Sequence, residues 1–168
     1  MTKSFLVSAA LLLCLALVET AILSNITFLP AVPDLVLICS LYLSFLNGRG
    51  MGEACGFSAG LFYDFLSGVP FGFNCLLRTL LGYFAGMLGG AVRYTGIVMP
   101  AVICFFGTLA KAFLIWFISL FYTSVAHYDL LSVRFAFELS ANTILAPFLF
   151  RFFHSFYRMI AVSPEEAD

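Results

Sequence analysis

The chain has 168 residues, of which 62% are hydrophobic and 10% are charged, with a mean hydropathy of +1.06 and a formal net charge of −1. A soluble domain carries roughly 25% charged residues, so this chain has too few polar groups to cover a soluble surface. The composition excludes a soluble globular domain and predicts an all-α integral membrane protein. The charge balance, with no basic stretch, gives no reason to expect a nucleic-acid partner.

Apolar segments separated by short turns divide the chain into six predicted transmembrane helices. Asp34 follows a loop with two prolines and is well placed to cap the second helix, which is short for a membrane span. Residues 1–162 form the predicted transmembrane domain, and residues 163–168 form a short acidic tail. The predicted helices cover residues 4–23, 34–46, 51–66, 71–92, 97–124 and 130–153.

The basic residues near the ends of these helices predict the orientation of the bundle. When the loops are assigned to alternate sides of the membrane, one side receives five basic residues and the other side receives none. Cytoplasmic loops carry the excess of Lys and Arg, so we expect both termini in the cytoplasm and a multi-pass protein of the bacterial inner membrane. The five residues are Lys3, Arg49, Arg93, Arg151 and Arg158.

The first apolar segment also resembles a secretory signal peptide, because Lys3 precedes an apolar run over residues 5–18. The run continues past Glu19 to Leu23, however, and no small-x-small cleavage site closes it. A retained first helix is therefore the favoured interpretation.

Six charged residues lie within the predicted helices, three acidic and three basic. An isolated charge at the centre of a bilayer costs at least about 2.5–3.5 kcal/mol, so such residues normally face the bundle interior and find partners. We expect a paired intramembrane network, in which Arg134 and Glu138 are one helical turn apart and Asn142 extends the same face. An ion path, as in a transporter, is the alternative use. The six residues are Glu19, Asp64, Arg78, Lys111, Arg134 and Glu138.

Small residues recur every fourth position in the third and fourth helices, a spacing that lets two helix backbones approach closely. A tight turn joins these helices, so the two stripes can face each other, and Asp64 and Arg78 would then form an ion pair near the outer end of the seam. Packing of each stripe on a different helix is the alternative. The stripes are Gly52, Gly56, Gly60 and Asp64 in the third helix and Arg78, Gly82, Gly86 and Gly90 in the fourth.

Sequence motifs for catalysis or for metal and cofactor binding are not found. The sequence has no HExxH motif, no Gly-rich phosphate loop and no CxxC pair, and no Ser–His–Asp set can be recognised. Its five cysteines lie in apolar segments, where cysteine packs as a small apolar residue. We therefore expect no enzymatic activity and no cofactor.

About a third of the chain resembles the rod shape-determining protein MreD family. The resemblance begins at residues 33–37 and Tyr42, and its most specific part is a GFxxGLxxD pattern over residues 56–64. A trailing SGxxxG pattern over residues 67–72 and the sequence GYFAG at residues 82–86 complete it. The resemblance implies a fold similar to the substrate-binding S components of energy-coupling-factor transporters.

The same resemblance implies a non-enzymatic scaffold of the bacterial cell elongation (rod) complex. Such a protein binds MreC in the lipid bilayer and helps couple MreB, indirectly, to RodA and the elongation transpeptidase, which supports peptidoglycan synthesis and cell shape. The alternative is a small-molecule-binding S component of an energy-coupling-factor-type transporter. Short loops, with little polar material to cap an outward pocket, favour the scaffold.

Overall fold

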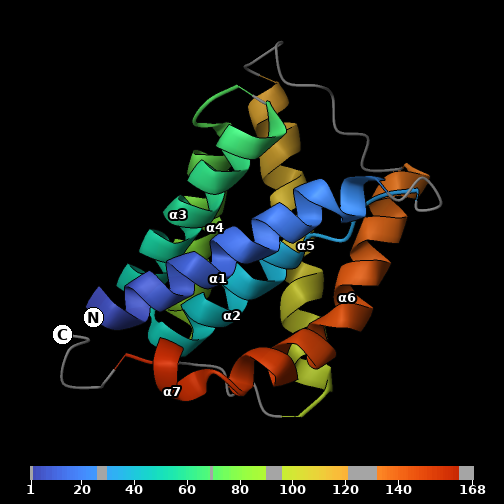
Figure 1. The fold of residues 1–168 in the computed structure, drawn as a ribbon. Helices are drawn as coiled ribbons and strands as arrows, with labels where there is room; N and C mark the ends of the chain where they lie inside the picture. Colours follow the sequence, from blue (N-terminus) through green and yellow to red (C-terminus); the bar gives the residue numbers. More distant parts are fainter. Residues whose placement is uncertain (1, 26–29, 69, 90–95, 121–131, 163–168) are drawn as a thin grey trace.

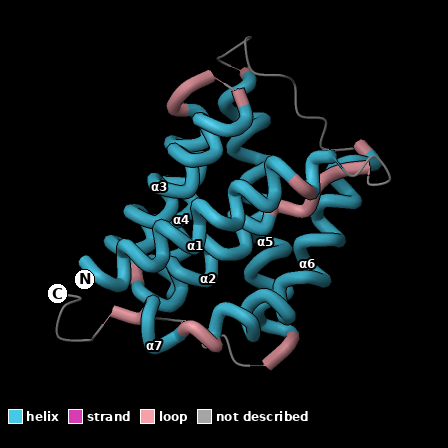
Figure 2. The backbone as a smooth tube through the Cα atoms, viewed as in Figure 1, coloured by secondary structure: helices cyan, strands magenta, loops and turns pink. Residues whose placement is uncertain are grey.

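A computed structural model describes residues 2–25, 30–68, 70–89, 96–120 and 132–162. These residues form a bundle of helices without any strand (Figures 1 and 2). Predicted helix residues 90–92, 121–124 and 130–131 and the predicted tail at 163–168 lie outside the described part. The helices are α1 (Thr2–Ala21), the short 3-10 helix η1 (Leu23–Asn25), α2 (Leu35–Asn47), α3 (Arg49–Ser67), α4 (Phe73–Gly89), α5 (Val98–Ser119), α6 (Val133–His154) and α7 (Tyr157–Ile160).

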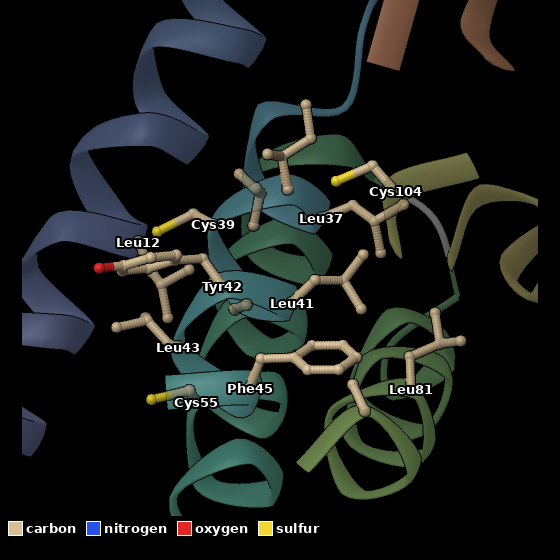
Figure 3. Close-up of a cluster of buried hydrophobic side chains, with 14 of the residues drawn as sticks. Leu12, Leu37, Cys39, Leu41, Tyr42, Leu43, Phe45, Cys55, Leu81 and Cys104 are labelled. Carbon is tan, nitrogen blue, oxygen red and sulfur yellow. The ribbon is translucent and has the colours of Figure 1, made fainter. Parts of the chain in front are cut away.

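The short helix α2 is the centre of the bundle. Residues 36–45 of α2 are all buried, and α2 contacts α1, α3, α4, α5 and α6. The other helices therefore surround α2. Its side chains Leu37, Leu41 and Phe45 form much of the apolar core shown in Figure 3, together with Leu12 of α1 and Leu81 of α4.

The helices agree with a membrane protein. Three of the described helical segments, Thr2–Asn25, Val98–Ser119 and Val133–His154, are long and apolar enough to cross a bilayer, and α2 is apolar but shorter. Large apolar side chains also cover the outside of the bundle, among them Phe106 and Phe148, which are 62% and 71% exposed. Six crossings of the membrane remain a prediction.

The two ends of the described chain lie side by side at one end of the bundle (Figure 1). The hydroxyl group of Ser4 in α1 donates a hydrogen bond to the carbonyl oxygen of Ala161 at a distance of 3.1 Å. Asn47 at the end of α2 bonds to the same region, through the Ile160 carbonyl oxygen and the Val162 N–H. These hydrogen bonds hold the N-terminal and C-terminal segments against the end of α2.

Helices α3 and α4 form a closely packed hairpin along the glycine positions of both helices. A Cβ atom built on Gly52 would lie 2.5 Å from the Gly82 carbonyl oxygen, and one built on Gly86 would lie 2.5 Å from the Gly48 carbonyl oxygen. Cβ atoms on Gly56 and Gly60 would collide with the backbone of Arg78 and Asn74. Gly90, the last member of the predicted stripe, lies outside the described residues. Backbone therefore meets backbone along this seam, which only glycine allows.

Candidate functional site: a buried polar layer

The beginning of α2 lies inside the bundle rather than at its surface. The 13 residues of α2 span about 20 Å at 1.5 Å per residue, whereas the hydrocarbon core of a bilayer is about 30 Å thick. The first turn of any helix leaves N–H groups without intrahelical partners, and in hydrocarbon these groups need partners from the protein. The position of this helix start therefore demands polar side chains deep in the protein.

Three side chains from different parts of the chain satisfy these N–H groups. The Asp34 carboxylate accepts from the Leu37 N–H at 2.7 Å, so the predicted cap of this helix is confirmed. Glu19 of α1 accepts from the Val36 N–H at 3.2 Å, and Asn142 of α6 accepts from the Asp34 N–H at 2.9 Å. These hydrogen bonds offset the cost of burying the helix start, and two of the three accepting side chains are carboxylates.

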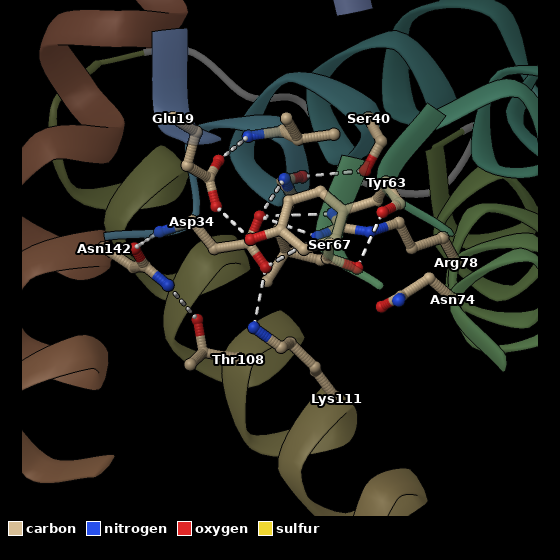
Figure 4. Close-up of polar contacts among 12 residues, drawn as sticks. Glu19, Asp34, Ser40, Tyr63, Ser67, Asn74, Arg78, Thr108, Lys111 and Asn142 are labelled. Carbon is tan, nitrogen blue, oxygen red and sulfur yellow. Dashed lines mark hydrogen bonds and ion pairs between the residues drawn. The ribbon is translucent and has the colours of Figure 1, made fainter. Parts of the chain in front are cut away.

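Asp34 carries the central charge of the site, and two cations neutralise it (Figure 4). The guanidinium group of Arg78 donates from both terminal nitrogens to Asp34, at distances of 3.0–3.1 Å. The ammonium group of Lys111 lies 2.7 Å from the second carboxylate oxygen of Asp34. Asp34 and Arg78 are each 2% exposed, so these are buried ion pairs. Removing one partner from a buried pair is strongly destabilising, at about 3–5 kcal/mol.

Side chains of α3, α5 and α6 complete the network. Lys111 also donates to the Glu138 carboxylate at 2.6 Å, which links α5 to α6. Asn142 donates to the Thr108 hydroxyl at 3.1 Å, which forms a second link between these helices. The Tyr63 hydroxyl of α3 donates to Glu19 at 2.9 Å, and the Arg78 guanidinium carbon lies 4.7 Å from the centre of the Tyr63 ring.

These groups form one polar layer to which every helix from α1 to α6 contributes, Asp34 being the cap of α2. The layer holds three carboxyl groups and two basic groups, so its charges nearly balance, and its hydrogen bonds join segments up to 108 residues apart in sequence. Such an arrangement fixes the mutual positions of the helices, since bonds of this kind need defined geometry. The polar layer consists of Glu19, Asp34, Tyr63, Arg78, Thr108, Lys111, Glu138 and Asn142.

The predicted ion pair between Asp64 and Arg78 is wrong, because Arg78 binds Asp34 and Asp64 has another use. The Asp64 carboxylate accepts from the backbone N–H groups of Gly72, Asn74 and Cys75, at distances of 2.9–3.2 Å. It also accepts from the Asn74 side-chain amide at 2.9 Å. Asp64 therefore caps the first turn of α4 from the neighbouring helix. The N–H groups of that turn have no partners within α4, so they bind the Asp64 carboxylate in place of the Arg78 guanidinium.

The remaining predicted network residues divide in two. Glu19, Lys111 and Glu138 belong to the polar layer, as described above. Arg134 is exposed on α6, and Glu138, one turn further along, is bonded to Lys111 of α5. A charged side chain on the outer turn of a membrane helix can reach water, so it needs no buried partner.

The sequence predicted Asp34 as a helix cap but not as the buried partner of Arg78 and Lys111, because a capping residue next to a loop is usually in contact with water. One signal was available: a predicted helix of only 13 residues cannot place both ends at the membrane surfaces. Tyr63 and Thr108 gave no signal of their own. Among the described residues, no group of three or more His, Cys, Asp or Glu side chains is placed to hold a metal ion.

Comparison with protein families matches residues 2–160 to the model of the rod shape-determining protein MreD. The chain belongs to the MreD family. It therefore has a role in rod shape determination, in a family that is structural rather than known for enzymatic activity. Comparisons with curated proteins and with solved structures give no match.

The geometry explains the pattern that resembles the MreD family. Gly56, Gly60 and Asp64 lie four residues apart on the face of α3 that meets α4, where two contact its backbone and the third caps its first turn. Gly68 and Gly72 in the connecting turn have φ angles of 65° and 94°, which side chains other than glycine rarely adopt. In this family member, the pattern builds the α3–α4 hairpin.

Proposed function

We propose that this MreD family member is a non-enzymatic scaffold of the bacterial cell elongation complex that binds MreC in the inner membrane. Through MreC it supports peptidoglycan synthesis by RodA and the elongation transpeptidase and is connected, indirectly, to MreB. Both termini lie in the cytoplasm, a proposal that rests on the one-sided distribution of Lys and Arg. The family assignment supports the shape-determining part of this proposal.

An apolar groove on the side of the bundle is the observation that carries the scaffold proposal. The groove has a volume of about 320 Å³, and no charged side chain lines it among the described residues. It runs along α5 from Met99 to Ala110, which is about 16 Å at 1.5 Å per residue. Its lining residues are Leu41, Phe45, Leu81, Phe84, Ala85, Leu88, Met99, Val102, Ile103, Phe106, Gly107 and Ala110.

The groove is suited to packing a single transmembrane helix, which we propose is that of MreC. Helices associate in lipid through close packing rather than through hydrophobic drive, and small residues at the contact permit that packing. Ala85 and Ala110, on α4 and α5, supply such positions beside the larger side chains of the groove. The polar layer supports the same proposal from the inside, because its ion pairs hold the helices that form the groove at fixed separations.

The vitamin-binding alternative is not favoured. A substrate-binding component needs polar groups that are free to receive a ligand, whereas the buried carboxylate of Asp34 already receives Arg78, Lys111 and the Leu37 N–H. Copurification separates the two functions, since a transporter component brings down ATPases and a scaffold brings down MreC.

Substitution in the groove tests the proposed function. Ala110→Leu fills the groove, and Ala10→Leu adds the same side chain at an exposed position of α1 as a matched control. Both variants are expressed in rod-shaped cells that lack their own MreD, and MreC is quantified after purification in mild detergent. We expect the wild type and Ala10→Leu to retain MreC and rod shape, and Ala110→Leu to lose both at an unchanged protein level. Wild-type protein that brings down no MreC would refute the function, and retention by Ala110→Leu would refute the groove.

A further inference from the structure

The last turns of α6, which lead to α7 in Figure 1, line a cavity of about 540 Å³. It lies between the start of α5 and the second half of α6, with α2 behind it, and is separate from both the polar layer and the apolar groove. The cavity is lined by Tyr42, Gly96, Ile97, Pro100, Pro147, Phe150, Arg151, His154 and Ser155.

Two prolines explain why the helices leave this space. Pro147 lies inside α6, where it has no N–H for the Thr143 carbonyl oxygen and its ring crowds that group. Figure 1 shows the last turns of α6 crossing the end of the bundle toward α7 instead of continuing along α5. Pro100 occupies the first turn of α5 on the other side of the cavity. The bend in α6 thus separates its final turns from α5.

The cavity combines basic groups with apolar side chains. Pro147, Phe150, Arg151 and His154 follow the spacing i, i+3, i+4 and i+7, which places them on one face of α6. Arg151 offers a charged, planar donor, and none of the nine described lining residues is acidic. Across the cavity lies Ile97, the N-cap residue of α5, whose apolar side chain cannot cap the first N–H groups of that helix. Unpaired N–H groups at the start of a helix attract anions.

From this combination we propose that the cavity binds the phosphate headgroup of an anionic glycerophospholipid. Arg151, His154 and the first N–H groups of α5 bind the phosphate, while Tyr42, Ile97 and Phe150 contact the first part of the acyl chains. A basic pocket between helices at the membrane interface is suited to such a headgroup. A soluble anion would satisfy only the basic groups and leave the apolar side chains in contact with water.

Stabilisation of the C-terminal end of α6 by Arg151 and His154 does not explain why these residues line the cavity. Basic residues in the last turn stabilise a helix by about 0.3–1 kcal/mol each, and they do so from any exposed position. Arg158 on α7 is equally basic and exposed, yet it does not line the cavity. It therefore provides a matched control that removes the same charge from the same end of the protein.

The test uses the full chain in nanodiscs of neutral phosphatidylcholine, with and without phosphatidylglycerol, and native mass spectrometry to count retained lipids. We expect the wild type and Arg158→Gln to retain phosphatidylglycerol with similar affinity. Arg151→Gln should weaken retention about fivefold or more, because one charge contact near the headgroup is lost. His154→Gln should weaken it in the same direction, and the thermal stabilities of all variants in neutral lipid should agree.

Three results would overturn the proposal. Equal weakening by Arg151→Gln and Arg158→Gln would mean general attraction of the membrane surface to basic residues. Displacement of the lipid by millimolar inorganic phosphate would mean that the cavity takes a free anion. No selective retention of phosphatidylglycerol by the wild type would mean that the cavity is filled by bulk lipid.

Discussion

The ion pair of Asp34 and Arg78 allows the sharpest test of the polar layer. Asp34→Asn keeps an oxygen that can accept from the Leu37 N–H, so the cap of α2 is retained while the charge is lost. Arg78 and Lys111, whose nitrogens lie 3.0 Å and 2.7 Å from Asp34, then lose their shared partner. Breaking a buried pair costs about 3–5 kcal/mol, and Asp34→Asn should lie at the upper end of that range, because Arg78 loses its carboxylate while Lys111 is left with Glu138 alone.

Arg78→Gln should cost less, near the lower end of about 3–5 kcal/mol, because Asp34 keeps Lys111 at 2.7 Å. The double variant, Asp34→Asn with Arg78→Gln, removes both partners of the pair, so no unpaired guanidinium stays buried, and Lys111 keeps Glu138. The double-mutant cycle should therefore return a coupling free energy of about 0.5–3 kcal/mol, the range for residues in contact.

The free energy of unfolding can be measured by titrating the protein from mild detergent into SDS. The fluorescence of Trp116, the one tryptophan of the chain, reports on α5. A second cycle, Asp64→Ala with Arg78→Gln, is the control and should be additive within about 0.5 kcal/mol, because Asp64 binds the first turn of α4 instead. Additivity in the first cycle together with coupling in the second would refute the network and restore the pair that the sequence indicated.

Two further predictions concern the hairpin and the topology. Gly56→Ala should destabilise the protein by about 1–3 kcal/mol in the same SDS titration, because the new Cβ atom meets the Arg78 backbone. Gly50→Ala, in the same helix with nothing within 4 Å, should leave stability unchanged or raise it, and equal losses would contradict close packing of the hairpin. Reporter fusions should read cytoplasmic after Gly50, after Tyr94 and at the C-terminus, and external near Val32, Val69 and Ala126. A C-terminal fusion that reads external would exclude six crossings with a cytoplasmic N-terminus.

Local features of the fold could be predicted from the sequence, whereas the pairing of charges could not. The cap at Asp34 depends only on residues next to it in the sequence, and the glycine stripe from Gly52 to Gly60 follows the period of a single helix. Arg78, in contrast, lies 44 residues from its partner and only 14 from Asp64, the nearest acid on the adjoining helix. To choose between Asp34 and Asp64 as the partner of Arg78, one must know the depth at which α2 begins. That depth depends on how five other helices surround α2.

The buried start of α2 also constrains how the protein is made. A ribosome delivers α2 to the membrane long before Lys111 and Asn142 have been synthesised, 77 and 108 residues after Asp34. Until α5 and α6 arrive, the carboxylate of Asp34 and its N–H group lack these partners, and a helix of 13 residues is too short to cross the bilayer securely by itself. The bonds at the start of α2 can therefore be completed only after α6 has been synthesised. We expect a chain that terminates before α6 to be less stable in the membrane than the full chain.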